Sequence, residues 1–227
     1  MPAKSKSRTS RGQHRLFIVD DHPIFREGLS KIVSQETDLQ VCGEADTADE
    51  AFAKITALKP DLVLTDIGLA GKSGLELIQD LQAVSPDLPV LVISMHDESV
   101  YAERVLRAGG RGYVMKQAGP AMMMQAIRHV LEGKVAVSDS ISAAVLESLV
   151  RPGAARAGAP MVAKLSNREF EVLRLIGQGK DSHDIAASLH LSIKTVDTHR
   201  GNIKAKLGLR TSTELIHYAV RWLAGQA

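Results

Sequence analysis

A short apolar run followed by a helical period recurs five times in the first 137 residues, and this alternation constrains the fold more than any other feature. The apolar runs predict strands at 16–19, 39–42, 62–65, 90–93 and 112–115. Between and after them, residues at helical spacing predict a helix that opens at Pro23 and helices at 48–58, 75–84, 100–108 and 120–131. Repeated βα units of this length predict an α/β fold, a doubly wound five-stranded parallel sheet with helices on both faces.

The last 63 residues keep a helical period throughout. They predict four helices with short connections, at 169–178, 182–189, 193–207 and 213–223, and therefore a small all-α domain. Between the two parts, residues 141–150 predict one more helix, and the Pro, Gly and Ala residues of 151–160 predict a linker.

These patterns divide the chain into a disordered basic tail at 1–14, an α/β domain at 15–137, a helix and flexible linker at 138–164, and a helical domain at 165–227. The overall charge of +2 hides an asymmetry. The α/β domain carries twelve Lys and Arg against eighteen Asp and Glu, whereas the helical domain carries nine against six. An acidic domain is joined to a basic one, which favours an anionic partner for the second.

Composition excludes several classes of protein. The single cysteine, Cys42, cannot form an internal disulfide, which favours a reducing compartment and a buried structural role for that thiol. The sequence has no apolar run of about 18 residues and no signal-peptide pattern at its start, so we expect a cytoplasmic protein without membrane partners.

Charged and polar residues end four of the predicted strands. Asp20 and Asp21 follow the first strand, Asp66 the third, Ser94 the fourth and Lys116 the fifth. The carboxyl ends of parallel strands share one edge of the sheet, so these side chains are expected to converge. Clustered carboxylates repel one another unless a hard cation such as Mg²⁺ lies among them.

Such a site suits phosphoryl transfer, in which the cation and Lys116 neutralise phosphate oxygens and Asp66 is the candidate nucleophile. Taken singly, each residue has an ordinary explanation. An Asp after a strand is usually a turn former or helix cap, and a lone Lys is usually a solvated charge. A phosphoryl-transfer site is favoured because all five residues occur together, in this order, at the ends of successive predicted strands.

In the helical domain, the predicted helices at 182–189 and 193–207 have the size and separation of a helix-turn-helix. Ser192 is a suitable amino-terminal cap for the second helix. The segment 192–210 contains five basic residues and one acid, Asp197, as expected for contact with phosphates of DNA. A small bundle with solvated charges is the alternative that charge alone would leave open.

Four segments of the α/β domain resemble the receiver domain of two-component response regulators. They read Val-Asp-Asp-His at 19–22, Asp-Leu-Val-Leu-Thr-Asp-Ile at 61–67, Val-Ile-Ser-Met-His-Asp at 92–97, and Ala-Gly-Gly-Arg-Gly-Tyr-Val-Met-Lys at 108–116. The resemblance implies a flavodoxin-like sheet in which Asp66 accepts phosphate from the phosphohistidine of a sensor histidine kinase. It implies that Mg²⁺ is held by Asp20, mainly through water, and directly by Asp21, Asp66 and the carbonyl of Gly68. Ser94 and Lys116 would contact the phosphate, and Tyr113 would be the aromatic residue that turns inward.

One loop departs from the pattern of that family. Where the family usually has Met-Pro-Gly, this chain has Leu69-Ala70-Gly71. Without the proline we expect an altered loop conformation or an altered lifetime of the phosphate, and not the loss of the site, because no ligand is replaced. His96, a loop residue typical of the family, is read as structural.

The helical domain resembles the LuxR-type DNA-binding domain. The matching segments read Leu-Ser-Asn-Arg-Glu-Phe-Glu-Val-Leu at 165–173 and Ser-Ile-Lys-Thr-Val-Asp-Thr-His-Arg-Gly-Asn-Ile-Lys-Ala-Lys-Leu-Gly at 192–208. With the receiver in front, the whole chain resembles the NarL/FixJ class of response regulators.

The second resemblance also implies roles for particular residues. Those that would face bases are Asp197, Thr198 and Gly201, and the phosphate or structural candidates are Lys194, Thr195, His199, Arg200, Asn202, Lys204, Lys206 and Arg210. An Asp among the base-reading residues favours a contact with cytosine N4. The last helix would form a homodimer on DNA through Leu215, Ile216, Ala219 and Trp222. For Trp222, packing that closes the core of its own domain is an alternative with equal support.

The function that these resemblances imply is a transcriptional regulator that binds a double-stranded DNA operator and is switched by phosphorylation. It would not be an enzyme, beyond the self-catalysed transfer and loss of the phosphoryl group. Two alternatives stay open. One is a DNA-binding regulator that is independent of phosphate, and the other is an aspartyl-phosphate phosphatase, which would need an acid at the position of Gly68.

Overall fold

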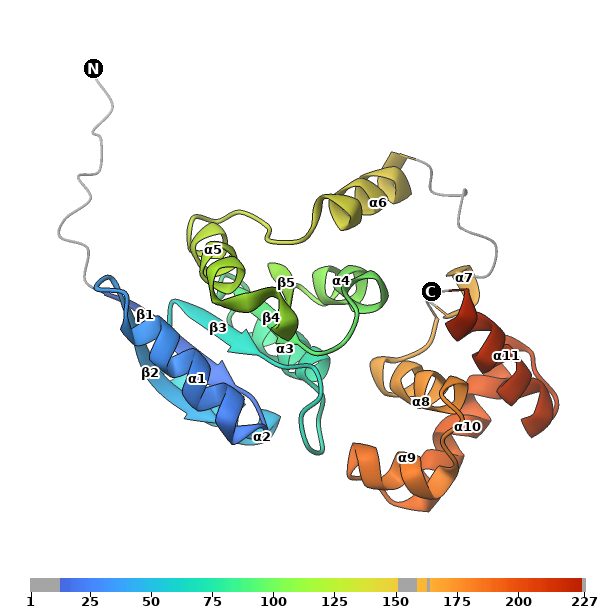
Figure 1. Cartoon of the computed structure of the whole chain (residues 1–227). Helices are drawn as coiled ribbons and strands as arrows, with labels where there is room; N and C mark the ends of the chain where they lie inside the picture. The colour runs from blue at the N-terminus through green and yellow to red at the C-terminus, as the bar shows by residue number, and fades with distance from the viewer. Residues whose placement is uncertain (1–12, 151–158, 163, 226–227) are drawn as a thin grey trace.

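The computed structural model describes residues 13–150, 159–162 and 164–225, and within this part of the chain two domains are folded (Figure 1). The first is a parallel sheet in the order β2-β1-β3-β4-β5. Its strands are β1 His14–Val19, β2 Leu39–Ala45, β3 Leu62–Thr65, β4 Val90–Ser94 and β5 Gly112–Met115. The order reverses after β1, so the carboxyl ends of β1 and β3 border the crevice where such sheets bind ligands.

Helices cover both faces of the sheet because successive strand residues point to opposite sides. Leu16 and Ile18 of β1 pack with helices α1 and α5, whereas Phe17 and Val19 pack with α2, α3 and α4. The helices span α1 Pro23–Ser34, α2 Ala48–Leu58, α3 Gly74–Val84, α4 Glu98–Arg107 and α5 Gly119–Leu131. A capping box between Ser73 and Glu76 fixes the start of α3 just after the loop that follows β3.

The second domain is helical. Its elements are α7 Ala159–Val162, α8 Asn167–Gly177, α9 Ser182–Leu189, α10 Ile193–Leu207 and α11 Ser212–Ala224. Side-chain caps from Ser166, Asp181, Ser192 and Thr211 begin α8 to α11, so each helix start is encoded locally. Helix α6, Asp139–Val150, follows the sheet domain in the chain.

The two domains are docked. Tyr101, Ala102 and Val105 of α4 belong to the same buried apolar cluster as Phe170 and Leu173 of α8. In Figure 1, α8 is the part of the helical domain that lies toward α3 and α4. The sheet domain and the helical domain therefore share a buried apolar interface.

The sequence predicted the order of the strands and main helices along the chain, and the structure corrects several boundaries. β1 begins at His14, which had been assigned to the tail, β2 extends to Ala45, and α4 begins two residues earlier than expected. The short helix α7 and a 3₁₀ turn at Lys116–Ala118 were not predicted. The predicted tail up to residue 12 and the linker at 151–158 lie outside the described residues.

Candidate functional site: an acidic cluster and a helix-turn-helix

Lys116 joins two of the predicted carboxylates at the edge of the sheet. Its Nζ lies 2.6 Å from Asp20 Oδ2 and 2.7 Å from Asp66 Oδ2. All three side chains are at least 95% buried. Two buried carboxylates that share one ammonium leave an excess of negative charge, which the site must offset with another cation or with hydrogen bonds.

The second oxygen of Asp66 is held by donors. Ser94 Oγ donates to Asp66 Oδ1 at 2.6 Å, and the Ile67 amide donates to the same oxygen at 2.6 Å. The Gly68 amide adds a longer contact of 3.3 Å. The structure thus brings together the carboxylate, hydroxyl and ammonium groups that the strand ends predicted.

These contacts decide the charge of the candidate nucleophile. Burial would raise the pKa of the Asp66 carboxyl, but Lys116 and Ser94 outweigh burial and hold this pKa below its ordinary value. At Asp20 burial dominates, and the pKa of its carboxyl is raised. Burial would lower the pKa of the Lys116 ammonium, but Asp66 and Asp20 raise it. Asp66 is therefore anionic and Lys116 cationic at neutral pH.

The remaining carboxylate of the cluster, Asp21, lies against a histidine. Asp21 Oδ1 is buried and accepts no hydrogen bond within the described structure. It lies 2.7 Å from the Nδ1 atom of His22, a residue that the sequence reading did not single out. Ligand atoms of Asp20, Asp21, His22 and Asp66 all lie within 4.8 Å of one another. This oxygen-rich pocket fits a hard divalent cation.

Phe25 is a second neighbour of the site that was missed. Its ring lies 4.4 Å from Lys116 Nζ, within the range of a cation–π contact. Phe25 is one of the apolar residues at helical spacing that predict the helix opening at Pro23. Its position in the first turn of α1, four residues after Asp21, is the one signal in the sequence that could have pointed to the site.

The predicted switch residue Tyr113 already lies inward. Its side chain is buried, and its hydroxyl donates to the carbonyl of His96 at 2.8 Å. Burial raises the pKa of the Tyr113 hydroxyl, so it stays a donor at all ordinary pH values. Burial lowers the pKa of His96 to about 4, so this imidazole is neutral.

The loop that departs from the family pattern is fixed without proline. Leu69 is buried in the apolar cluster, and Ala70 forms an isolated bridge with Thr47 at the start of α2. Gly71 adopts φ +76°, a conformation that favours glycine. These contacts give the loop a defined conformation without proline, and the altered lifetime of the phosphate stays a prediction.

The predicted base-reading residues lie on the exposed face of α10. Asp197, Thr198 and Gly201 are exposed, as are Lys194, Asn202, Lys206 and Arg210, whereas Thr195, His199, Arg200 and Lys204 are half-buried. Val196 and Ile203 point into the core on the opposite side. A helix with one buried face and one polar exposed face can enter a major groove.

Three of these candidates, Asp197, Arg200 and Lys206, make contacts with other helices of the domain. Asp197 Oδ1 accepts a hydrogen bond from Ser182 Oγ of α9 at 3.0 Å, and Arg200 Nη1 donates to the same hydroxyl at 3.3 Å. Lys206 Nζ donates to Glu169 Oε2 of α8 at 2.6 Å. Lys206 thus pairs within its own domain, which favours the structural role over contact with a phosphate.

The face of α11 that was expected to form a dimer needs correction. Leu215 and Ala219 are completely buried in the core of their own domain, so they cannot contact a second copy. Ile216 is 42% exposed, and its neighbour one turn later, Val220, is 46% exposed. Trp222 packs edge-on against Phe170 with ring centroids 5.3 Å apart, which is the core-closing role.

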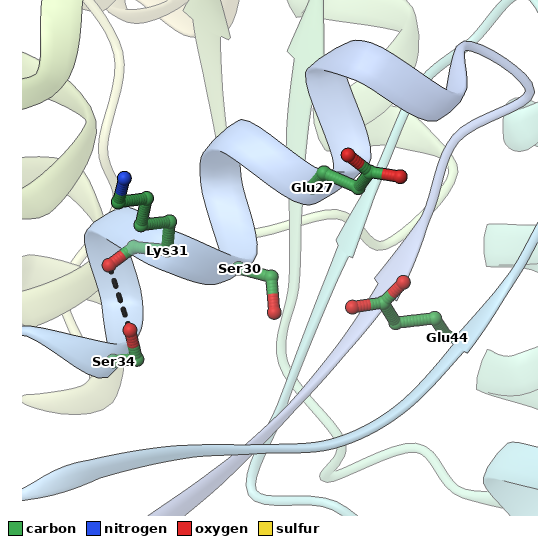
Figure 2. A pocket seen from close by; sticks show the side chains of 5 residues that line it. All are labelled: Glu27, Ser30, Lys31, Ser34 and Glu44. Atoms are coloured by element: carbon green, nitrogen blue, oxygen red, sulfur yellow. Dashed lines mark hydrogen bonds between the residues drawn. The ribbon is translucent and has the colours of Figure 1, made fainter.

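A polar hollow of about 320 Å³ lies beside α1, apart from the acidic cluster. Figure 2 shows Glu44 of β2 facing Glu27 and Ser30 of α1, with Ser34 Oγ donating to the Lys31 carbonyl at 2.8 Å. None of its lining residues belongs to the cluster around Asp66. No helix in the described part of the chain is long and apolar enough to cross a membrane.

Comparison with known proteins defines the class that this fold and site represent. Residues 16–128 match the response regulator receiver domain, and residues 163–219 match the bacterial regulatory proteins of the luxR family. A receiver followed by this helix-turn-helix domain defines a DNA-binding transcription regulator of two-component systems. The chain belongs to the LuxR family of response regulators.

Particular relatives cover nearly the whole chain. The oxygen regulatory protein NreC of Staphylococcus aureus is 34% identical over 211 residues, which are 91% of this chain and 97% of NreC. The RcsB response regulator of Salmonella typhimurium is 27% identical with a TM-score of 0.64, over 92% of this chain and 98% of RcsB. A structure of two RcsB dimers bound to two parallel DNAs is similar with a TM-score of 0.55 at 28% identity, over 91% of this chain and 98% of that one.

Proposed function

We propose that phosphorylation of Asp66 by a sensor histidine kinase switches the DNA binding of this regulator. The observation that carries the proposal is the placement of Lys116 and Ser94 on the two oxygens of Asp66. One buried carboxylate is thereby anionic, fixed in position and next to a cation that can move onto phosphate oxygens.

The chemistry follows from these groups. An oxygen of Asp66 attacks the phosphorus of a phosphohistidine, the P–N bond breaks, and the electron pair leaves with the imidazole nitrogen, which takes up a proton. Lys116 and Ser94 then donate to the oxygens of the transferred group. The same site can accept a phosphoryl group from a small acyl phosphate. Gly68 has no side chain, so no second acid stands two residues after Asp66 to support repeated turnover of phosphate monoesters.

The acidic cluster would hold Mg²⁺ through Asp20, Asp21 and Asp66, with the Gly68 carbonyl. When bound, this cation supplies positive charge to phosphate oxygens. Ligand atoms of Asp20, Asp21 and Asp66 that lie within 4.8 Å of one another support this assignment. Asp21 and Asp20 keep their oxygens turned toward Asp66, and Lys116 neutralises the rest of their charge.

The output is proposed to be binding to a DNA operator as a homodimer. The exposed face of α10 supplies the groove contacts, and Ile216 and Val220 of α11 supply an apolar surface for the second copy. Two exposed apolar side chains one turn apart suit a helix from a symmetric partner. That RcsB is described as DNA-bound dimers supports this assembly.

Labelling with acetyl phosphate tests the proposal. In the presence of Mg²⁺, the parent chain should gain one phosphoryl group by intact mass, and Asp66→Asn should gain none. Chelation of the cation should abolish labelling of the parent. Binding to genomic DNA fragments should respond to acetyl phosphate in the parent only. Equal labelling of the two proteins, or an equal DNA response, would contradict the proposal.

A second candidate is a regulator that binds DNA without phosphate. Two observations favour it, because the DNA-facing residues of α10 are already exposed and Tyr113 is already inward. The same experiment separates the two functions. If Asp66→Asn binds its operator as tightly as the phosphorylated parent, the phosphate-independent function holds.

A further inference from the structure

A chain of hydrogen bonds links the start of α9 to the exposed face of α10. Arg200 Nη1 donates to Ser182 Oγ at 3.3 Å, and Ser182 Oγ donates to Asp197 Oδ1 at 3.0 Å. Ser182 is the first residue of α9, and the other two residues lie about one turn apart on α10. The sequence had assigned possible DNA contacts to Asp197 and Arg200 but no role to Ser182.

The neighbours of Ser182 fix the direction of its hydroxyl. A guanidinium can only donate a hydrogen bond, and an ionised carboxylate can only accept one. The Ser182 proton therefore points at Asp197, because Arg200 donates to the oxygen of the same hydroxyl. Ser182 and Arg200 are half-buried, so this chain is partly shielded from water. The hydroxyl holds the Asp197 carboxylate in one orientation.

The second carboxylate oxygen of Asp197 is available to DNA. Asp197 is exposed, and no group in the described part of the chain donates to its Oδ2 atom. The residue opens the second turn of α10, and the amino-terminal turns of a recognition helix are the ones that contact base edges. A carboxylate oxygen there can accept from the exocyclic amino group of cytosine or adenine in the major groove.

The neighbouring base-reading candidate has the same polarity. Thr198 Oγ1 donates to the carbonyl of Lys194 at 2.9 Å, so its proton is already engaged. Only its oxygen lone pairs remain for a base. Asp197 and Thr198 thus present acceptors side by side, which suit the amino groups of bases and not the acceptor atoms of guanine or thymine.

An acid on this face costs affinity unless it finds a donor. The segment 192–210 carries five basic residues, and Asp197 is its only acid. DNA phosphates repel a carboxylate, so Asp197 adds nothing to binding that ignores sequence. The repulsion is offset only where an amino group meets the free oxygen. Each of the four base pairs presents its amino group at a different place in the groove, so a carboxylate in a fixed orientation favours one of them.

We propose that Ser182 is a positioning residue for sequence recognition, which aims Asp197 at the amino group of one base of the operator. This inference rests on the proposed groove contacts of α10 and is independent of phosphorylation at Asp66. Without the hydroxyl, Asp197 samples several rotamers, and ordering it on the base costs free energy. Discrimination between base pairs then falls, while the contacts that other side chains make with phosphates remain.

The test uses the full chain and a pool of DNA duplexes of randomised sequence, with acetyl phosphate and Mg²⁺ present throughout. Asp197→Ala identifies the base pair that Asp197 reads, as the position where the preference of the parent is lost. For each variant, we then compare binding to the preferred duplex and to a duplex changed at that base pair. The parent should discriminate by about tenfold or more. Ser182→Ala should lower this ratio by about threefold or more.

Matched variants separate positioning from a general structural role. Ser182→Thr keeps a hydroxyl and should restore the discrimination of the parent. Ser188→Ala removes another hydroxyl of α9, which donates to the Asp184 carbonyl at 2.8 Å within that helix, and should leave discrimination unchanged. The salt dependence of binding should be equal for Ser182→Ala and the parent, because no charge is removed. Thermal unfolding checks that each variant is folded.

The outcomes separate the inference from the contacts on which it rests. If the parent selects no sequence, or if Asp197→Ala keeps every preference of the parent, the proposed base contact of Asp197 fails, and the inference fails with it. If Asp197→Ala loses a preference that Ser182→Ala keeps in full, only the positioning role of Ser182 fails. If Ser182→Ala binds all duplexes more weakly by one common factor, its role is structural, and the inference is overturned.

Discussion

Lys206 Nζ lies 2.6 Å from Glu169 Oε2, and this ion pair joins the last turn of α10 to the first turn of α8. The Glu169 side chain is 5% exposed and also closes the capping box with Ser166. Lys206→Ala should therefore lower the free energy of unfolding by about 1 kcal/mol, because a buried carboxylate loses its partner. Urea unfolding measures this cost.

Lys204→Ala is the matched control for a phosphate contact. Lys204 lies two residues earlier on α10 and is half-buried. Its loss should leave stability almost unchanged but weaken DNA binding and lower the salt dependence of binding by about one unit. If Lys206→Ala shows the larger loss of salt dependence and no loss of stability, the structural assignment of Lys206 is wrong.

The same ion pair predicts a dependence on pH. Burial would raise the pKa of the Glu169 carboxyl, but Lys206 and Ser166 outweigh it, and the pKa lies below its ordinary value of 4.5. A lowered pKa in the folded state contributes stability that is present above the ordinary value and lost as the pH falls through the lowered one. The stability difference between the parent and Lys206→Ala should be full at neutral pH and shrink below 4.5. Denaturation curves of the parent and of Lys206→Ala at pH 7 and at pH 3.5 to 4 measure this stability difference. A difference that is the same at both pH values would contradict the prediction.

Gly74 should tolerate no side chain. A Cβ at this first residue of α3 would lie 1.9 Å from the carbonyl oxygen of Asp66. Gly74→Ala should therefore displace the Asp66 backbone, cost about 3 kcal/mol or more of stability, and reduce labelling by acetyl phosphate. Gly28→Ala is the control, because a Cβ there meets nothing within 4 Å in the exposed middle of α1. It should stabilise the protein by about 0.5–1 kcal/mol. Equal effects of the two substitutions on labelling would exclude the steric explanation.

Substitutions at Leu215 and Ile216 should distinguish the buried core face of α11 from its proposed dimer face. Leu215→Ala removes a completely buried side chain and should cost about 2–5 kcal/mol of stability. Ile216→Glu changes a side chain that is 42% exposed, so stability should change by less than about 0.5 kcal/mol. If α11 forms the dimer, Ile216→Glu should instead weaken cooperative binding to paired half-sites. Thermal unfolding measures stability, and analytical ultracentrifugation with operator DNA measures dimer formation. If Ile216→Glu lowers stability as Leu215→Ala does and leaves the dimer intact, Ile216 belongs to the core and not to the dimer surface.

Much of the site could be predicted because the end of each strand is marked in the sequence by a polar residue after an apolar run. Asp20, Asp66, Ser94 and Lys116 each follow or end an apolar run, and parallel strands bring their carboxyl ends to one edge. The contact of Phe25 with Lys116 was missed because an aromatic residue at helical spacing looks the same whether it packs on a core or on an ammonium. Helix boundaries shifted by only one or two residues, since caps such as Ser73, Ser166 and Ser192 are local signals.

The docking of the domains could not be predicted in this way. Arg104 binds a carbonyl 58 residues away in the chain, and Arg168 binds one 97 residues away. Backbone carbonyls are present at every position, so the sequence carries no mark of which one an arginine will reach. Leu215 and Ala219 of α11 were assigned to a dimer surface, because the apolar residues of this helix occupy more than one face and only packing against α8 selects the buried one.

The sequence by itself determined a receiver-like sheet with a carboxylate cluster, and a basic helix-turn-helix domain behind it. Hydrophobic period and the order of strand ends specify both, because they act through local geometry and the direction of parallel strands. Only the tertiary structure decided that α4 and α8 dock, that Lys206 serves the fold, and that Ile216 and not Leu215 faces outward on α11. The physical reason is that these outcomes depend on which distant surfaces pack together, and packing is a property of the assembled molecule.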